Sequence, residues 1–305
     1  MSETTERRAG FVAILGAPNV GKSTLLNQLI GTKVSIVTPK VQTTRRRIIG
    51  ITVRGGAQIL FVDTPGIFRP RGRRPLERAM VRAAWVAAAD ADLVLAVVDA
   101  RRGLDAETRL VFEGLRTQAT PRFLVVNKID LVKDKRKLLP LVDEANRSLA
   151  FERTFLVSAL RADGLADLLD AVAARLPPGP WLFPEGQTSD LPPSVLAAEI
   201  TREQVFLQLQ QELPYHITVE TDAWTESPDG SEVRIDQTIY VTRESHKLIV
   251  LGKGGQRIRA IGEKARRQLE ALLGRRVHLF LFVKVRERWM EDPERYRTMG
   301  LDFPG

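Results

Sequence analysis

FVAILGAPNVGKSTLLNQLI, residues 11–30, is the stretch that decides the fold of the first half of the chain. An apolar run at 11–16 leads directly into GAPNVGKS at 16–23, and an amphipathic segment follows. The pattern G-x-x-x-x-G-K-[ST] between a strand and a helix is typical of a phosphate-binding loop, whose glycines let backbone N–H groups close on phosphate oxygens. Lys22 would supply a point charge to the β- and γ-phosphates, and the Ser23 hydroxyl would ligate Mg²⁺.

Short apolar runs continue along the chain and alternate with amphipathic segments. The runs predict strands near residues 11–16, 48–53, 58–63, 93–98, 122–127 and 154–157, with helices between most of them. This alternation is typical of a mainly parallel sheet covered by helices on both faces. We therefore expect an α/β nucleotide-binding domain over the first half of the chain.

DTPG at 63–66 follows the apolar run ILFV, so Asp63 is expected at the carboxyl end of a strand, where open α/β sheets bind ligands. Its carboxylate would hold Mg²⁺, with a helix or turn cap as the alternative role. Gly66 has no Cβ to block the approach of a γ-phosphate to its N–H. Beside a phosphate loop, the motif favours the metal-binding role.

NKID at 127–130 ends a further strand and indicates which base is bound. The Asp130 carboxylate can accept both the ring N–H and the exocyclic amine of guanine, whereas adenine presents an acceptor and no amine at these positions. A site that leaves such a buried acceptor unpaired rejects the wrong base by roughly 10⁴-fold. Asn127 and Lys128 would brace the loop, and SAL at 158–160 would offer the Ala159 N–H to the guanine oxygen. These motifs favour GTP over ATP.

Phosphate loop, DTPG, NKID and SAL in this order resemble a translation-factor-type GTPase domain covering residues 11–176. The resemblance implies that a threonine between the first two motifs completes the Mg²⁺ shell; Thr43 and Thr44 are available, and Thr44 is favoured because related GTPases carry the threonine just before this arginine position. The predicted metal ligands are Ser23, Thr44 and Asp63. The predicted nucleotide-binding residues are Gly16, Ala17, Pro18, Asn19, Val20, Gly21, Lys22, Ser23, Thr24, Asp63, Thr64, Pro65, Gly66, Asn127, Lys128, Asp130, Ser158, Ala159 and Leu160.

The residues after DTPG are Ile67 and Phe68, where many GTPases carry a water-orienting glutamine. In this the chain resembles the hydrophobic-substituted GTPases, in which an asparagine matching Asn19 helps hold K⁺ against the phosphates. Such a cation could take the place of an arginine finger, which is worth about 10³ to 10⁵ in rate elsewhere. We expect slow intrinsic turnover in which Asn19, Lys22, Thr44 and Gly66 take part, with a turn cap as the alternative role of Asn19.

The segment PPGPWLFPEGQTSDLPP at 177–193 cannot continue a helix or a central strand, because it holds six prolines and two glycines. We therefore divide the 305 residues into a GTPase domain at 1–182, a linker at 183–192 and a second domain with a C-terminal tail at 193–305. The second domain reads as a helix, a hairpin with Pro-Asp-Gly at 228–230, two helices and a strand. The expected order is α-β-β-α-α-β.

Gly252-Lys253-Gly254-Gly255 lies between the two helices and resembles the GxxG loop of a KH domain, of the type II order. Glycines there let the backbone approach four nucleotides of a single strand. Apolar Ile249, Val250, Ile258 and Ile261 could line the cleft, although some must be core. The predicted RNA-binding residues are Gly252, Lys253, Gly254, Gly255, Arg257, Arg259 and Lys264.

The charge distribution agrees with an anionic polymer as partner. The net charge is +9, and residues 247–288 carry twelve basic and three acidic side chains, whereas residues 191–240 carry two and nine. A solvated basic helix face is the alternative. The chain has no cysteine and three scattered histidines, which excludes disulfides, a cysteine nucleophile and thiolate metal sites.

GTPase domain, linker and KH domain together resemble the Era family of bacterial GTPases, from about residue 10 to the end. QTTRRRIIGI at 42–51, ELPY at 212–215 and FVKVRERWMEDP at 282–293 carry the same resemblance. It implies a GTP/GDP switch that binds the 3′ end of small-subunit ribosomal RNA and acts on the assembling 30S subunit. The arginines at 45–47 and 69–74 lie in the two expected switches and could meet RNA or the second domain in one nucleotide state.

Three other functions stay open on the sequence alone: a P-loop ATPase or kinase, a non-catalytic RNA-binding scaffold with structural nucleotide, and peripheral attachment to the inner membrane through the basic face. No apolar run approaches the roughly 18 residues of a membrane span. Arg7 and Arg8 before an apolar run imitate a signal peptide, but the run is too short and Glu3 and Glu6 precede it. We expect a monomeric cytoplasmic protein.

Overall fold

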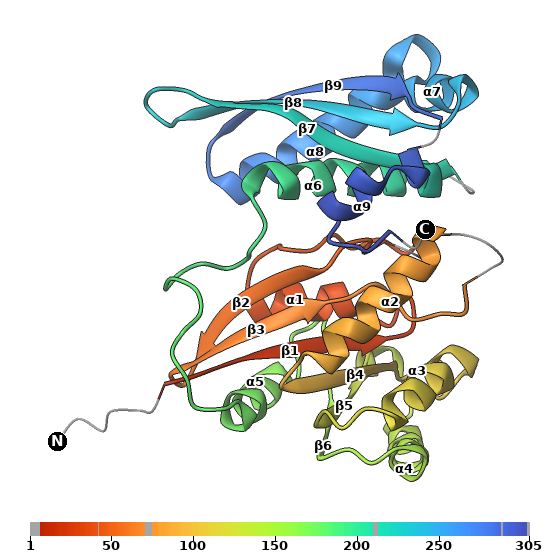
Figure 1. Ribbon diagram of the computed structural model, residues 1–305, viewed down its shortest axis with the longest axis vertical. Helices are drawn as coiled ribbons and strands as arrows, with labels where there is room; N and C mark the ends of the chain where they lie inside the picture. Colours follow the sequence, from red (N-terminus) through yellow and green to blue (C-terminus); the bar gives the residue numbers. More distant parts are fainter. Residues whose placement is uncertain (1–6, 42, 71–74, 210–212, 288, 304–305) are drawn as a thin grey trace. The chain divides into compact units, whose positions relative to one another are not determined.

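The computed structural model describes residues 7–41, 43–70, 75–209, 213–287 and 289–303 (Figure 1). The chain forms two compact units. The first comprises residues 1–35, 44–190 and 297–305, and the second comprises residues 36–43 and 191–296. Among the described helices, none is long and apolar enough to cross a bilayer.

The first unit is built on a six-stranded sheet in the order β2-β3-β1-β4-β5-β6. All neighbouring pairs are parallel except β2 and β3, which are antiparallel. The strands are β1 (Arg8–Gly16), β2 (Ile48–Arg54), β3 (Ala57–Asp63), β4 (Leu93–Asp99), β5 (Arg122–Asn127) and β6 (Arg153–Leu156). The mainly parallel sheet predicted from the alternation is confirmed, and every expected strand is present, with ends that differ from the expected ones by at most three residues.

Helices cover both faces of this sheet (Figure 1). One core cluster joins apolar residues of β1, β4 and β5 to three helices on one face, and β4 is buried along its whole length, as a strand covered on both sides must be. The helices of this unit are α1 (Lys22–Ile30), α2 (Pro75–Ala89), α3 (Ala106–Arg116), α4 (Leu138–Ser148) and α5 (Leu165–Arg175), with short 3₁₀ turns at Ile129–Leu131 and Lys135–Lys137.

The sheet register brings the predicted motifs to one edge. Gly16 ends β1, Asp63 ends β3 and Asn127 ends β5, and the strands between them keep these ends level: Ile14 pairs with Asp63, and Asp99 pairs with Asn127. Because the carboxyl ends of parallel strands lie along the same edge of the sheet, residues far apart in sequence come together there.

The proline-rich segment before the second unit packs along the first unit. The buried side chain of Gln58 in β3 donates to the Phe183 carbonyl at 2.8 Å and accepts from the Leu182 N–H at 2.7 Å. Further along, the Ile51 N–H donates to the Thr188 carbonyl at 2.9 Å. Backbone groups that prolines leave without regular partners thus find them on β2 and β3.

The second unit has a three-stranded sheet in the order β7-β8-β9, in which β7 and β8 are antiparallel and β8 and β9 are parallel. Helices α6 and α8 pack on one face of it through two apolar clusters. The elements are α6 (Pro193–Gln208), β7 (Ile217–Glu226), β8 (Glu232–Val241), α7 (Glu244–Leu251), α8 (Gln256–Leu273) and β9 (Arg276–Val285). This is the predicted order α-β-β-α-α-β.

The expected C-terminal tail contains structure that the sequence pattern did not predict. A 3₁₀ turn at Trp289–Glu291 precedes helix α9 (Pro293–Thr298). Trp289 is buried, and its indole N–H donates to the His216 carbonyl at 3.1 Å. A single buried tryptophan with a satisfied N–H therefore anchors a segment too short to show helical periodicity.

Candidate nucleotide and nucleic-acid sites

The phosphate loop turns from β1 into α1 through left-handed backbone at Asn19 and Gly21, with φ of 63° and 99°. A Cβ on Gly21 would lie 2.4 Å from Asn127 Nδ2, so only glycine fits there. The Lys22 ammonium is buried and donates to the carbonyls of Gly16 and Ala17 at 3.1 and 3.2 Å. Burial lowers the pKa of Lys22 to about 8, against the opposing charge of Asp63. The loop holds a desolvated cation at the place where phosphates are expected.

Asp63 collects the predicted metal ligands. Its Oδ2 accepts hydrogen bonds from Ser23 Oγ at 2.7 Å, Ser35 Oγ at 2.9 Å and Thr44 Oγ1 at 3.3 Å. Its buried Oδ1 has no hydrogen-bond partner in the described part of the chain, and burial raises the pKa of this carboxyl. Hydroxyl and carboxylate oxygens are hard donors of the kind that Mg²⁺ takes, together with phosphate oxygens and water. The residues therefore fit Mg²⁺.

The structure separates the two candidate threonines. Thr44 Oγ1 lies 2.9 Å from Ser23 Oγ, whereas the Thr43 hydroxyl bonds to Thr38 Oγ1 at 2.6 Å and to the Lys40 carbonyl at 2.7 Å. Thr44 therefore bonds to the predicted metal ligands, whereas the described bonds of the Thr43 hydroxyl lie within residues 36–43. Gly66 also lies against the phosphate loop, because a Cβ there would come within 2.9 Å of Pro18 Cα.

The predicted base-binding residues form one network at the ends of β5 and β6. Asn127 is buried, donates to the Val20 carbonyl at 2.9 Å and accepts from the Ala159 N–H at 3.0 Å. Asp130 Oδ1 accepts from the Ser158 hydroxyl at 2.7 Å. The Ala159 N–H, which the sequence assigned to the guanine oxygen, is thus engaged by Asn127 here, while Leu160 is exposed. The network fixes the orientation of the Asp130 carboxylate.

The GKGG loop joins α7 to α8 through three glycines with positive φ. Gly252 has φ 72° and ψ 172°, and Gly254 and Gly255 have φ of 58° and 76°. Lys253 is exposed at its tip. Such a loop presents backbone N–H groups at the start of α8, where the helix dipole favours phosphate.

Exposed cations follow on α8. Arg257 donates to the Ile249 carbonyl at 2.7 Å and Arg259 to the Gly254 carbonyl at 3.2 Å, so both lie against the loop. Lys264 is also exposed, whereas Arg266 and Arg267 form ion pairs with Glu270 and Glu263 on the same helix. Only part of the basic helix therefore remains available to an anion.

The two candidate sites can be compared with known proteins. A family model described as "50S ribosome-binding GTPase" matches residues 11–128, and one described as "KH domain" matches residues 212–290. GTPase Era of Afipia carboxidovorans is 58% identical over 297 residues, which cover 97% of this chain and 95% of that protein. The chain belongs to the Era family of GTPases. GTPase Era of Mesorhizobium japonicum is 57% identical over 303 residues, covering 99% of this chain and 96% of that protein.

Solved structures of Era match both units of the chain. An Aquifex aeolicus Era variant bound to GDP·AlF₄⁻ superposes with a TM-score of 0.90 at 40% identity, covering 96% of this chain and 99% of that one. A crystal structure of Era with MgGDPNP and nucleotides 1506–1542 of 16S ribosomal RNA gives the same score, identity and coverage. The resemblance to a GTPase domain followed by a KH domain is confirmed.

Sequence reasoning missed three residues of the nucleotide region in this Era-family chain. Asp99, at the end of β4, is buried and accepts from Lys128 Nζ at 2.7 Å. Arg102 donates to the Pro18 carbonyl of the phosphate loop at 2.9 Å, and Ser35 donates to Asp63. Asp99 could have been found, because it ends an apolar strand between two that carry motifs; Ser35 and Arg102 have no such signal.

Residue 67 is isoleucine in this member of the family, where other GTPases carry a catalytic glutamine. Ile67 is buried in the core of the first unit, and its N–H donates to the Gly16 carbonyl at 3.1 Å. Its side chain can orient no water. Three of the predicted switch arginines, at positions 71, 73 and 74, lie outside the described residues.

Residues 36–41 and 43, which stand between the phosphate loop and DTPG in the Era-family sequence, pack in the second unit against α6. The Val37 N–H donates to Glu203 Oε1 at 2.8 Å, and Arg202 donates to the Thr43 carbonyl at 2.7 Å. Lys40 Nζ donates to the carbonyls of Phe206 and Leu209, at the C-terminal end of α6, where the helix dipole favours a cation. The second unit thus holds the segment that directly precedes Thr44 in the sequence.

The apolar residues predicted to line a KH cleft divide into two sets. Val250 and Ile261 are fully buried core residues, so for them the cleft assignment is wrong. Ile249 is exposed, Ile258 is half-buried, and Leu248, which the prediction omitted, is 67% exposed. Apolar surface beside the GKGG loop therefore comes from α7 more than from α8.

We expect Gly252→Ala to destabilise the second unit by about 1–3 kcal/mol, because φ 72° with ψ 172° is a backbone conformation that only glycine adopts readily. The added Cβ would also lie 2.8 Å from Arg257 Cβ. Urea unfolding, monitored by hydrogen exchange of amides in α7 and α8, measures the loss in free energy of unfolding. Gly254→Asn is the control, since asparagine tolerates the left-handed region and nothing lies within 4 Å there. Equal losses in both variants would refute a backbone origin of the effect at Gly252.

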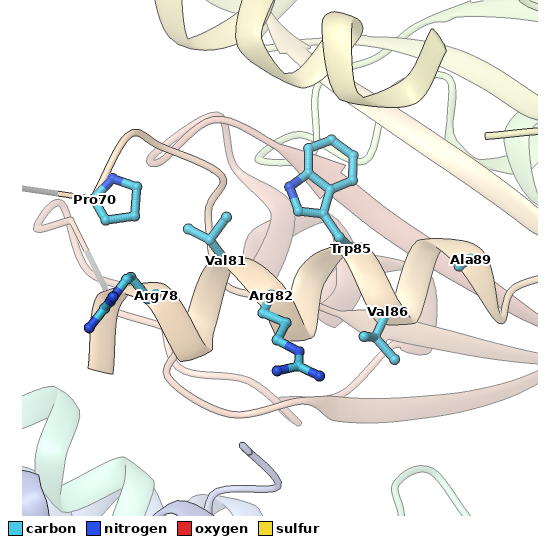
Figure 2. Close-up of a pocket in the computed structure, with 7 residues that line it drawn as sticks. All are labelled: Pro70, Arg78, Val81, Arg82, Trp85, Val86 and Ala89. Atoms are coloured by element: carbon cyan, nitrogen blue, oxygen red, sulfur yellow. The ribbon is translucent and has the colours of Figure 1, made fainter. Parts of the chain in front are cut away.

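A hollow of about 540 Å³ lies along α2 in the first unit (Figure 2). It is lined by Pro70, Arg78, Val81, Arg82, Trp85, Val86 and Ala89. The Trp85 ring packs on Gly114, where a Cβ would lie 2.3 Å from the indole. Among the described residues, this lining includes no motif residue, carboxylate or hydroxyl, so we assign it no role in nucleotide binding.

Proposed function

We propose that this Era-family GTPase binds the 3′ end of 16S ribosomal RNA and acts in assembly of the 30S subunit as a GTP-driven switch. The domain assignment is part of the proposal: residues 1–182 bind and hydrolyse GTP, 183–192 link the domains, and 193–305 bind RNA. The observation that carries it is the presence on one chain of the Asp130 network and the GKGG loop. The MgGDPNP and 16S RNA complex of a 40% identical Era supports it.

On the first unit, Ser23, Thr44 and Asp63 would hold Mg²⁺, which supplies electrostatic stabilisation to the transferring phosphoryl group when bound. The chain itself contributes the buried Lys22 ammonium and the Gly66 N–H beside the phosphate loop. These groups position the substrate and stabilise its charge, but none of them is a side-chain base, so we expect turnover to be slow.

The switch step follows from the contacts on either side of residue 43. Thr44 bonds to Ser23 and Asp63, whereas the Thr43 carbonyl accepts from Arg202 of α6. A change of metal or phosphate contacts at Thr44 is transmitted through one peptide bond to a segment held by the KH unit. Differential contacts of this kind let nucleotide bias two conformations.

The decisive experiment compares RNA binding in two nucleotide states. Full-length protein loaded with a GTP analogue or with GDP is crosslinked to 16S ribosomal RNA, and the attached RNA is sequenced. The proposal expects crosslinks at the 3′ end in the GTP-analogue state and fewer with GDP. Equal crosslinking in both states would leave an RNA-binding scaffold with structural nucleotide, and preferential ATP binding would leave a P-loop ATPase.

We expect GTP turnover to be stimulated by K⁺ over Na⁺, and Asn19→Ala to lose most of that stimulation. Asn19 sits at left-handed backbone in the phosphate loop, and its carbonyl accepts from Lys128 Nζ. Steady-state phosphate release in KCl and NaCl measures the effect. Asn146→Ala, on the exposed side of α4, is the matched control. Equal turnover in both salts for the unmodified protein would exclude a K⁺ site.

We further propose a monomeric protein acting in the cytoplasm, because the assembling subunit is found there. Peripheral contact with the inner membrane through the basic residues of α8 is the alternative. Co-sedimentation with vesicles containing anionic lipid at physiological salt distinguishes the two, since electrostatic attachment of a few basic residues weakens steeply with ionic strength.

A further inference from the structure

The three-stranded sheet of the second unit has one face turned away from its helices. On β9, Val277, Leu279, Leu281 and Val283 pack into the apolar clusters formed with α6 and α8. Because successive side chains of a strand point to opposite faces, the alternate residues lie on the outer face. Two of these are phenylalanines: Phe280 is 44% exposed and Phe282 is 52% exposed.

Part of this outer face is covered by the C-terminal segment. The Arg295 guanidinium lies 4.6 Å from the centre of the Tyr240 ring and pairs with Glu220 of β7. In the sheet register, Tyr240 is opposite Lys284. Phe280 and Phe282 are opposite Asp236 and Thr238 and remain exposed. The aromatic pair is therefore not the packing site of the C-terminal segment.

The charged residues around the pair are of both signs. Three cations (Arg234, Arg276 and Lys284) and three carboxylates (Asp222, Glu232 and Asp236) lie on this part of the face, where Asp222 accepts from the Thr238 hydroxyl opposite Phe282 at 2.5 Å. Glu232 pairs with Arg276 at 3.4 Å and with His278 at 2.9 Å, and Asp236 pairs with Arg234 at 3.2 Å. Lys284 has no carboxylate partner in the described ranges. An anionic ligand would meet the available Lys284 ammonium, with Glu232 and Asp236 paired to cations and Asp222 bonded to the Thr238 hydroxyl.

The aromatic groups are arranged for stacking. The Arg234 guanidinium already lies 4.7 Å from the centre of the Phe280 ring, so one planar group is stacked there. Phe282 follows two residues later on the same face, about 7 Å along the strand. Exposed rings on a sheet face, combined with a guanidinium plane and a cation, match the chemistry that binds unpaired bases and their phosphates. A protein partner would fit better on an apolar patch without the Arg234 guanidinium and the Lys284 ammonium beside it.

The position of β9 connects this face to the GKGG loop. β9 is an edge strand of the sheet (Figure 1), and α8, which begins at the loop, packs over its inner side. At that contact a Cβ on Gly262 would lie 3.3 Å from the Leu281 side chain. A strand held at the GKGG loop therefore has the edge of β9 beside it, and the phenylalanines lie just across that edge.

We propose that Phe280 and Phe282, with Arg234 and Lys284, form a second subsite that stacks bases of single-stranded RNA beyond the nucleotides held at the GKGG loop. This rests on the proposed function, since it extends the same RNA-binding unit. The subsite adds affinity for longer strands and leaves the binding of a tetranucleotide unchanged.

The test uses the full-length protein with Mg²⁺ and a GTP analogue, and fluorescent RNAs of four and twelve nucleotides from the 3′ end of 16S ribosomal RNA. We expect Phe282→Ala to weaken binding of the twelve-nucleotide RNA by about 5- to 100-fold and to leave the tetranucleotide within about twofold. Phe280→Ala should act in the same direction. Lys284→Ala should reduce the salt slope of the longer RNA by about 0.7.

Matched variants separate base stacking from simple apolar contact. Phe282→Trp should retain affinity for the longer RNA, and Phe282→Leu, which keeps the apolar surface, should lose it. Leu182→Ala, at an equally exposed apolar residue of the first unit, should change nothing. Because both phenylalanines are exposed, unaltered thermal unfolding of each variant verifies the fold.

The outcomes distinguish the two proposals. If the unmodified protein binds neither RNA, the proposed function fails. If it binds both, and the alanine variants bind the longer RNA as tightly as it does, the subsite fails and the proposed function stands. Full affinity in Phe282→Leu would also overturn the subsite, because apolar contact with a protein would then explain the exposed pair.

Discussion

Asp130→Asn is expected to reverse the base preference of this GTPase, shifting the ratio of GDP to XDP affinity by roughly 10⁴-fold. The Ser158 hydroxyl holds one oxygen of the Asp130 carboxylate at 2.7 Å, which leaves the carboxylate oriented as a double acceptor. Asparagine replaces one acceptor with an NH₂ donor. That donor opposes the exocyclic amine of guanine and complements the carbonyl that xanthine carries at the same position. Equilibrium binding of fluorescent GDP, XDP and ADP to the full chain measures the change.

Asp134→Asn is the matched control for this experiment. Asp134 lies four residues further along the same loop, where it pairs with Arg136, and it should leave base preference unaltered. Loss of GDP binding without a gain in XDP binding would mean that the variant only disrupts the loop. Retained preference for GDP would refute the assignment of Asp130 to the base.

The phosphate loop could be predicted because its residues encode local backbone geometry. Gly16, Gly21 and Lys22 lie within seven residues, and the loop needs glycine where its backbone meets another strand: a Cβ on Gly16 would lie 2.5 Å from the Val97 carbonyl. The gathering of Ser23 and Asp63 also followed, because parallel strands end at one edge of a sheet. Motif and periodicity together thus predicted the first unit and the place of its site.

Contacts that depend on no period and no motif could not be predicted. Lys40 reaches the end of α6 across more than 160 residues of chain, and nothing in the surrounding sequence names its partner. For Gln58 the sequence predicts the need but not the partner. A polar residue in the apolar strand AQILFVD must form hydrogen bonds when buried, but nothing in the sequence shows that Leu182 and Phe183 provide them. The assignment of Val250 and Ile261 to the cleft was wrong for a related reason, since helical spacing alone does not show which side of a helix faces the core.

Lys22→Ala should abolish the chemistry while leaving the fold intact. The ammonium is desolvated and held by two loop carbonyls, so it is ready to stabilise phosphate charge without reorganisation. Removal of one such preorganised donor costs at least about 10²-fold in turnover. Phosphate release under saturating GTP measures the loss. Without nucleotide the variant should unfold at the same or a higher temperature, because the cost of the buried charge is removed, whereas the rise in Tm on adding GDP should shrink. Lys33→Ala, outside the motif, should preserve both.

The low pKa of Lys22 gives this variant a second signature. Because burial lowers that pKa from 10.5 to about 8, the folded protein without nucleotide binds fewer protons than the unfolded chain between those two values. The cost of the buried charge is therefore complete below pH 8 and is relieved as pH rises towards 10.5, so the stability of the nucleotide-free protein gains a rising component in this window. GDP affinity should fall over the same window, since phosphate requires the charged ammonium. Lys22→Ala should remove the rising stability component and reduce the fall in GDP affinity, part of which remains because the guanine ring N–H also ionises in this window. If the stability component persists unchanged in the variant, another group titrates and Lys22 is not its source.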